Sequence, residues 1–152
     1  MTVLWVNNNI PGLYMIRYLF ASHGPLASGM AESVTFIAGK DKHIDTICAY
    51  MDPSISLVQQ IEDVFNTYDS NDEIIVLTDL YGGSVNNEFI NLLQKKKFYL
   101  VAGMSMALAI QLLMTLDEND LETGIKNAVN EGNSAVIYCN DLIKKANKEE
   151  DF

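Results

Sequence analysis

The stretch MIRYLFASHG, residues Met15–Gly24, decides the fold that this sequence predicts. Six of its first seven residues are apolar or aromatic, and only Arg17 is charged. A short run of this kind is typical of a strand buried on both faces of a sheet. The run ends abruptly at Ser22–Pro25, so His23 is expected where the carboxyl end of a strand meets the next helix. In open α/β sheets this edge is where ligands bind.

Strands and helices alternate along the rest of the chain. Runs rich in β-branched and aromatic residues predict strands, and apolar residues at helical spacing predict helices. Four further strands are predicted, the last of them short: Ile44–Tyr50, Ile74–Leu80, Phe98–Ala102 and Ala135–Cys139. Five helices are predicted. They are about Leu26–Ile37, one starting at Pro53 and Ser54 with Ser54 as N-cap, one following Ser84 and ending at about Leu93 or Gln94, about Met106–Leu116, and Asp120 to about Glu131.

This alternation predicts βαβ units with right-handed crossovers, and therefore a parallel sheet. For the first four strands we expect an open α/β sheet of flavodoxin-like order 2-1-3-4, with helices on both faces. The short last strand is expected either as an antiparallel edge strand or paired with a second subunit. We expect one domain over residues 15–140, preceded by an extension at 1–14 and followed by a polar tail, or frayed helix, at 141–152.

The composition limits the possible functions. Of the 152 residues, 49% are hydrophobic and 20% are charged, which is typical of a globular protein. The net charge of −10 argues against nucleic acid as a partner. No apolar run reaches the roughly 18 residues that a membrane span needs. Met1–Tyr14 lacks the basic start and long apolar core of a secretory signal, so we expect a cytoplasmic protein.

The cysteines and histidines give no pattern for a metal site. Cys48 and Cys139 both fall inside predicted strands, so we expect buried, reduced thiols, with a disulfide or redox role as the alternative. Two histidines and two cysteines at distant positions do not have the spacing of zinc ligands. We expect the protein to need no metal or organic cofactor.

The predicted strand order brings two distant loops together. The first and third strands are neighbours, and their connections leave in opposite directions, so a crevice is expected at their carboxyl ends. The first strand delivers Ser22 and His23 to this crevice, and the third delivers Asp79 and the Gly82–Ser84 loop. We therefore expect His23 and Asp79 to meet, although they are far apart in the sequence.

The chemistry of this pair favours phosphoryl transfer. A carboxylate that accepts from one imidazole nitrogen fixes the tautomer and leaves the other nitrogen as a nucleophile. Gly82 and Gly83 allow close approach to an anion, and we expect Ser84 to cap the next helix, whose N–H groups bind phosphate. Ser22 is expected either to hydrogen-bond the phosphate or to stabilise the turn. The chain has no Gly-x-x-x-x-Gly-Lys-Ser/Thr pattern, so we do not expect ATP to be the donor.

Two motifs resemble those of a known family. Ala-Ser-His-Gly at Ala21–Gly24 and Asp-Leu-Tyr-Gly-Gly-Ser at Asp79–Ser84 are similar to the two signatures of the mannose-type (mannose/fructose/sorbose) enzyme IIA proteins. These proteins belong to the bacterial phosphoenolpyruvate-dependent sugar phosphotransferase system. The similarity in order and spacing covers about Met15–Leu116.

The resemblance implies a set of roles and partners. It implies that His23 is phosphorylated by the phosphocarrier HPr and passes the group to a IIB component, which serves a membrane IIC/IID transporter. It implies that Asp79 hydrogen-bonds and orients His23, and that Ser84 lies at the phosphate site. It also implies a flavodoxin-like fold and a homodimer in which a terminal strand, here Ala135–Cys139, can cross to the partner's sheet.

The sequence also departs from the family pattern. Val85 stands where the family usually has Pro, a small change at the first position of a helix. At Gly103–Leu108 the family's Asn and Pro are missing. Two alternatives stay open: the phosphoryl-donor subunit of a dihydroxyacetone kinase, whose histidine motif lacks the glycine after His, and a non-catalytic anion-binding or regulatory module on the same fold.

Overall fold

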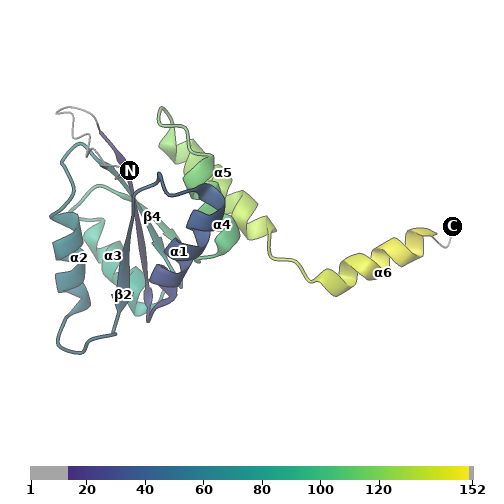
Figure 1. Ribbon diagram of the computed structural model, residues 1–152, viewed down its shortest axis with the longest axis horizontal. Coiled ribbons are helices and arrows are strands. Elements are labelled where there is room, and N and C mark those ends of the chain that lie inside the picture. The colour runs from purple at the N-terminus through teal and green to yellow at the C-terminus, as the bar shows by residue number, and fades with distance from the viewer. Residues whose placement is uncertain (1–13, 151–152) are drawn as a thin grey trace, which may run out of the picture. The chain divides into compact units, whose positions relative to one another are not determined.

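The computed structural model describes residues 14–150 of the chain (Figure 1). The chain divides into two compact units, residues 1–104 and 105–152, and each is described by itself below. The predicted extension over residues 1–14 lies outside the described residues except for Tyr14. The division at Met104 and Ser105 falls within the range predicted as one domain, and that domain boundary stays a prediction.

The first unit is built on a parallel sheet of four strands. The strands are β1 (Ile16–His23), β2 (Ile44–Ala49), β3 (Glu73–Thr78) and β4 (Tyr99–Ala102), in the order β2-β1-β3-β4. All three pairings are parallel. Ala21 of β1 lies opposite Ile47 on one side and Thr78 on the other, so the three strands end at the same edge. The predicted order 2-1-3-4 is confirmed.

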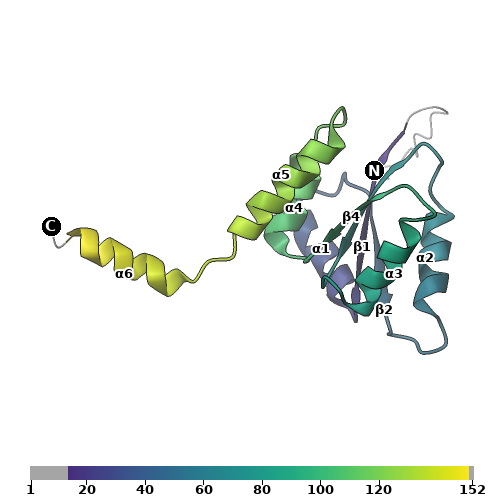
Figure 2. The ribbon, with the colours of Figure 1, turned by 180° about the vertical axis from the view of Figure 1, so that it is seen from behind.

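Helices cover both faces of this sheet. Helix α1 (Leu26–Ala38) packs on β1 and β2 on one face, and α2 (Leu57–Phe65) and α3 (Ser84–Leu92) lie on the other (Figures 1 and 2). Because side chains alternate between the faces of a strand, Leu19, Ala21 and Val76 point towards α2 and α3. Both faces of β1 are therefore buried, as the apolar run predicted.

An aromatic cluster fills the core beneath α2 and α3. Phe65, Phe89 and Phe98 pack with ring centroids 5.5 to 6.5 Å apart, and the two contacts of Phe98 are edge-to-face. Such contacts add about 0.5–1.5 kcal/mol per pair beyond the apolar area they bury. The cluster fixes α3 against the sheet, and α3 begins at the edge where β1 and β3 end.

Polar side chains tie the opposite edge of the sheet together. Arg17 Nε donates to Asp72 Oδ2 at 2.9 Å, and Asp72 also accepts from the backbone N–H groups of Met15 and Asp69. Burial acts to raise the pKa of Asp72, but these hydrogen bonds outweigh it and hold that pKa below its ordinary value. The start of β1 is thus fixed to the turn before β3.

The second unit contains three helices. Helices α4 (Met106–Met114) and α5 (Leu121–Ser134) pack against each other, and α6 (Cys139–Glu150) follows after a short coil. Ser105 and Asp120 cap α4 and α5 by accepting backbone N–H groups. At Gly132 of α5, an added Cβ would lie 2.8 Å from Cβ and 2.9 Å from Cα of Leu108. The absence of a side chain there allows the two helices to approach closely.

The fifth strand predicted at Ala135–Cys139 does not form an edge strand of this chain's sheet, and its pairing with a second subunit stays a prediction. Residues 135–138 form a turn and coil, and α6 begins at Cys139. Val136, Ile137 and Tyr138 are 82%, 54% and 66% exposed. These residue types favour a strand, but a strand needs a neighbouring edge for its backbone hydrogen bonds, and the described part of the chain provides none here. Cys139 is accordingly exposed rather than buried in a strand, whereas Cys48 lies in β2 and is half-buried; both are free thiols.

Two predicted helix caps are also wrong. The N-cap of α2 is Ser56, whose hydroxyl accepts from the N–H of Gln59, while the hydroxyl of Ser54 donates to Asp52 in the preceding turn. The N-cap of α3 is Gly83, and Ser84 is the first helical residue.

No helix in the described part of the chain combines the length and the apolar character needed to cross a lipid bilayer.

Candidate functional site

The ends of β1 and β3 bring His23 and Asp79 together. Beyond the pair Ala21 and Thr78, the N–H of Asp79 still donates to the carbonyl of Ala21 at 3.2 Å. Oδ2 of Asp79 then accepts both the backbone N–H of His23 and its ring Nδ1, each at 2.8 Å. The sheet register therefore sets the position of the carboxylate against both the backbone and the imidazole of His23.

The carboxylate of Asp79 is enclosed, whereas the imidazole reaches solvent. The side chains of His23 and Asp79 are 41% and 12% exposed. Burial acts to raise the pKa of Asp79, but hydrogen bonds from the His23 imidazole, the His23 N–H and the Leu80 N–H outweigh it and lower that pKa below its ordinary value. Asp79 is thus an ionised acceptor at neutral pH, and Nδ1 of His23 carries the shared proton.

The second imidazole nitrogen faces α3. Nε2 of His23 lies 3.0 Å from Oγ of Ser84. With the proton on Nδ1, Nε2 holds a lone pair, and the Ser84 hydroxyl donates to it. The hydroxyl of Ser84 is used in this way instead of capping α3, because an N-cap must precede the first helical residue.

The loop before α3 passes close to the imidazole. Gly82 has φ 76°, in the left-handed region that favours glycine. At Gly83 an added Cβ would lie 3.2 Å from Cε1 of His23 and 3.2 Å from the carbonyl oxygen of Leu80. A side chain at Gly83 would therefore press on the imidazole.

The N–H groups of the two glycines are already used within this loop. Gly82 N–H donates to Oδ1 of Asn86, and Gly83 N–H donates to the carbonyl of Leu80. In the described part of the chain, the N–H groups of Ser84 and Val85 at the start of α3 donate to no protein acceptor. Of the two residues, Ser84 is exposed and Val85 is fully buried, so the Ser84 N–H is the one open to an anion. A direct phosphate contact by Gly82 or Gly83 stays a prediction.

Ser22 belongs to β1, and its hydroxyl is bound to the turn that follows this strand. Its side chain is fully buried, its hydroxyl donates to the carbonyl of Gly24 at 3.0 Å, and it accepts from the N–H of Ala27 at 2.7 Å. The structure thus assigns Ser22 to the start of α1, and its contact with a phosphate stays a prediction.

The sequence reasoning missed two residues at this edge. Asn86 is buried and donates to Oγ1 of Thr78 while it holds Gly82, so it fixes the loop to the end of β3. Tyr50 follows β2, and its hydroxyl lies 2.7 Å from Oγ of Ser84. Its ring centroid is 5.6 Å from that of the His23 ring. The position of Tyr50 could have been predicted from the sequence, because it follows β2, and β2 ends at the same edge of the sheet as β1.

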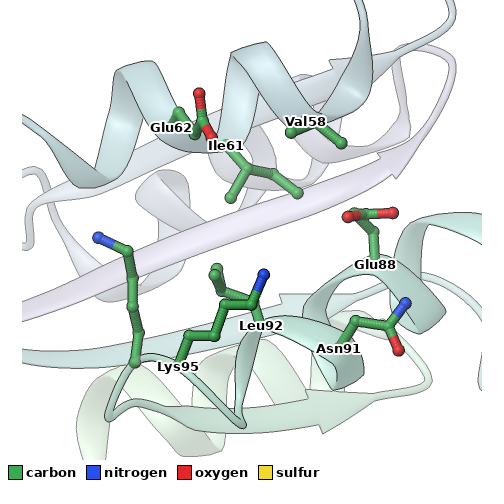
Figure 3. A pocket seen from close by; sticks show the side chains of 8 residues that line it. Val58, Ile61, Glu62, Glu88, Asn91, Leu92 and Lys95 are labelled. Carbon is green, nitrogen blue, oxygen red and sulfur yellow. The ribbon is translucent and has the colours of Figure 1, made fainter.

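A separate surface pocket lies between α2 and α3 (Figure 3). It has a volume of about 340 Å³ and contains none of the predicted site residues. Apolar side chains form its floor, with glutamates and lysines around them: Val58, Ile61, Leu92, Asn91, Glu62, Glu88, Lys95 and Lys96. Among the residues that the structure describes, no group of three or more His, Cys, Asp or Glu side chains is arranged to hold a metal ion.

A known protein family matches most of this chain. The model of a family described as the PTS system fructose IIA component, where PTS denotes the sugar phosphotransferase system, matches residues 18–129. This range contains both loops that meet at His23 and extends through most of α5.

Several solved structures are similar to this one. A protein described as a phosphoenolpyruvate-dependent sugar phosphotransferase system permease from Klebsiella pneumoniae subsp. pneumoniae MGH 78578 is 39% identical, with a TM-score of 0.79. The match covers 86% of this chain and 95% of that one.

Two more distant structures share the fold. The mannose/sorbose-specific IIA subunit from Enterococcus faecalis is 24% identical over 81% of this chain and 93% of that one, with a TM-score of 0.67. The PTS IIA protein associated with the fucose utilization operon of Streptococcus pneumoniae is 24% identical over 86% and 97%, with a TM-score of 0.66.

Proposed function

This chain belongs to the family of PTS fructose IIA components, and from that premise we propose that His23 carries a phosphoryl group from phospho-HPr to a IIB component during sugar uptake. The observation that supports this most directly is the geometry of His23. One ring nitrogen donates to Asp79 at 2.8 Å, and the other faces the hydroxyl of Ser84 and the start of α3. Asp79 orients the imidazole, and no metal or organic cofactor takes part.

In this proposal Nε2 is the nitrogen that is phosphorylated. The Nε2 lone pair of His23 attacks the phosphorus of the donor phosphohistidine, an Nε2–P bond forms, and the donor's N–P bond breaks with its electron pair returning to the donor nitrogen. The Nδ1 proton stays hydrogen-bonded to Asp79, which stabilises the positive charge that develops on the ring. Transfer to the acceptor is the same step in reverse, with a new nucleophile.

The start of α3 supplies the phosphate contacts. The N–H group of the exposed Ser84, together with the positive end of the helix dipole, would bind an anion beside Nε2. The hydroxyl of Ser84 is a second donor. Phosphoryl transfer depends mainly on such positioning and on electrostatic stabilisation.

Partners are proposed to dock at the edge around His23. The exposed apolar side chains Leu26, Met51 and Leu80 follow the ends of β1, β2 and β3 at this edge. The net charge of −10 would attract partners with basic surfaces. HPr and the IIB component would use the same face, and the membrane IIC/IID transporter would be reached only through IIB.

We also propose that the protein is a homodimer. Residues 135–139 carry exposed β-branched and aromatic side chains, and a strand of a second copy would satisfy their backbone groups. The segment predicted as a fifth strand would then form one between subunits.

Labelling tests the phosphocarrier role. We expect the protein, incubated with radiolabelled phosphoenolpyruvate, enzyme I and HPr, to gain one acid-labile, alkali-stable phosphate. His23→Ala should gain none, while its thermal unfolding curve should stay cooperative. Because His43 lies outside the site, at 3.3 Å from Asp45, His43→Ala is the matched control and should label like the wild type. No label on the wild type would contradict the proposal and favour a non-catalytic binding module.

A further inference from the structure

Tyr50 occupies an unusual backbone position beside the site. Its φ is 67°, and it is the one non-glycine residue of the described chain with a positive φ. Bulky residues rarely adopt this conformation, and strained residues tend to cluster at functional sites. Here the conformation accompanies a side chain whose hydroxyl lies 2.7 Å from Oγ of Ser84.

The hydrogen bonds at the site form a chain whose direction is fixed. The ionised Asp79 only accepts, so Nδ1 of His23 donates, and in the neutral imidazole, which is the nucleophilic form, Nε2 must then accept. Ser84 therefore donates its single hydroxyl proton to Nε2. Because that proton is used, the hydroxyl of Tyr50 must donate to Oγ of Ser84. The three hydrogen bonds then run in one direction, from Tyr50 through Ser84 and His23 to Asp79.

We propose that Tyr50 is a positioning residue that aims the hydroxyl proton of Ser84 at Nε2 of His23 and, after transfer, at an oxygen of the bound phosphoryl group. This inference rests on the proposed function. When the Nε2 lone pair forms the bond to phosphorus, Nε2 can no longer accept, and the Ser84 hydroxyl turns to the nearest new acceptor. Tyr50 continues to donate to Oγ, so the hydroxyl keeps its place while its acceptor changes.

The effect of Tyr50 should be larger on the phosphorylated protein than on the free one. Hydrogen bonds to a charged phosphoryl oxygen are about twice as strong as bonds to a neutral acceptor. Hydrogen bonds in series polarise one another, so a donor behind Ser84 strengthens the bond that Ser84 donates. Loss of the Tyr50 hydroxyl should therefore slow phosphoryl gain and shorten the lifetime of the phosphohistidine.

Tyr50→Phe is the first test, because it removes the hydroxyl and keeps the ring that packs near His23. We expect phosphoryl gain from phospho-HPr to slow about tenfold, less than the 10²–10³-fold typical of losing a donor that touches the reacting group directly. In a Ser84→Ala background, Tyr50→Phe should have no further effect, because Tyr50 acts through Ser84. Tyr99→Phe is the control, since Tyr99 begins β4 at the edge opposite the site and its hydroxyl makes no hydrogen bond to a described residue.

A second readout does not depend on phosphoryl transfer. In ¹⁵N NMR spectra of the unphosphorylated protein at alkaline pH, Tyr50→Phe should shift the Nε2 resonance of His23 and leave the Nδ1–H tautomer unchanged. Tyr99→Phe should shift neither resonance, and cooperative thermal unfolding of each variant would show that it is folded.

The outcomes separate this inference from the proposed function. Equal slowing by Tyr50→Phe with and without Ser84, or an unchanged Nε2 resonance, overturns the role of Tyr50. A wild-type protein that gains no phosphate refutes the phosphocarrier role instead, and the Nε2 resonance then decides by itself whether Tyr50 aims Ser84.

Discussion

At the scale of single residues, Asp79 has two separable roles. Its Oδ2 holds the imidazole and the backbone N–H of His23. We expect Asp79→Ala to slow phosphoryl gain by about 10²-fold, because the imidazole loses both its orientation and its charge partner. The protein should still fold, with a loss of about 1–2 kcal/mol in the free energy of unfolding. Labelling rates and urea denaturation measure the two effects, and an unchanged rate would contradict the orienting role.

The stabilising effect of Asp79 should depend on pH in one direction. Its pKa is lower in the folded protein than in the unfolded chain, so its contribution to stability is complete above the ordinary aspartate pKa of about 3.9. That contribution is lost as the pH falls below this value and through the lowered pKa. The stability difference between wild type and Asp79→Ala should therefore shrink as the pH falls through this acid range.

Sequence reasoning worked at this scale where topology alone places a residue, and it failed where a hydroxyl has several possible partners. His23 and Asp79 were expected together because neighbouring parallel strands end at one edge, and the structure brings them to 2.8 Å. Ser84 was expected to cap its helix, but the helix already begins at Ser84, so its hydroxyl meets His23 and Tyr50 instead. The catalytic roles stay predictions.

At the scale of elements, two helical glycines should respond in opposite ways to the same change. Gly132→Ala would place a methyl group against the backbone of Leu108 and should lower the free energy of unfolding by about 1–3 kcal/mol. Gly29→Ala in α1 meets no atom within 4 Å and should raise it by about 0.5–1 kcal/mol. Thermal and urea unfolding check both variants, and equal effects would contradict the close approach of α4 and α5.

The elements that the sequence predicted well are those with both a strong pattern and a partner within the chain. The run Ile74–Leu80 was expected as a strand, and β3 covers Glu73–Thr78. Ala135–Cys139 has similar residue types, but no edge of the described chain pairs with it, so it is coil followed by helix. Local propensity alone does not make a strand.

At the scale of the whole molecule, the proposed homodimer is testable by mass. We expect light scattering to give about twice the chain mass of 16.9 kDa. Ile137→Pro removes a backbone N–H that a strand between subunits would use and should shift the protein towards monomer. Ile137→Val keeps the β-branched side chain and should remain dimeric. A wild-type monomer would contradict the proposal.

The position of Nε2 as the one ring nitrogen of His23 that is not bound to Asp79 has a kinetic consequence for the proposed function. Asp79 holds the imidazole through Nδ1, so Nε2 is the nitrogen left for both transfer steps. Donor and acceptor must then visit the same nitrogen in succession, because two proteins do not fit over one atom at once. Turnover should follow a ping-pong scheme, and unphosphorylated HPr should compete with IIB for the protein that is phosphorylated on His23.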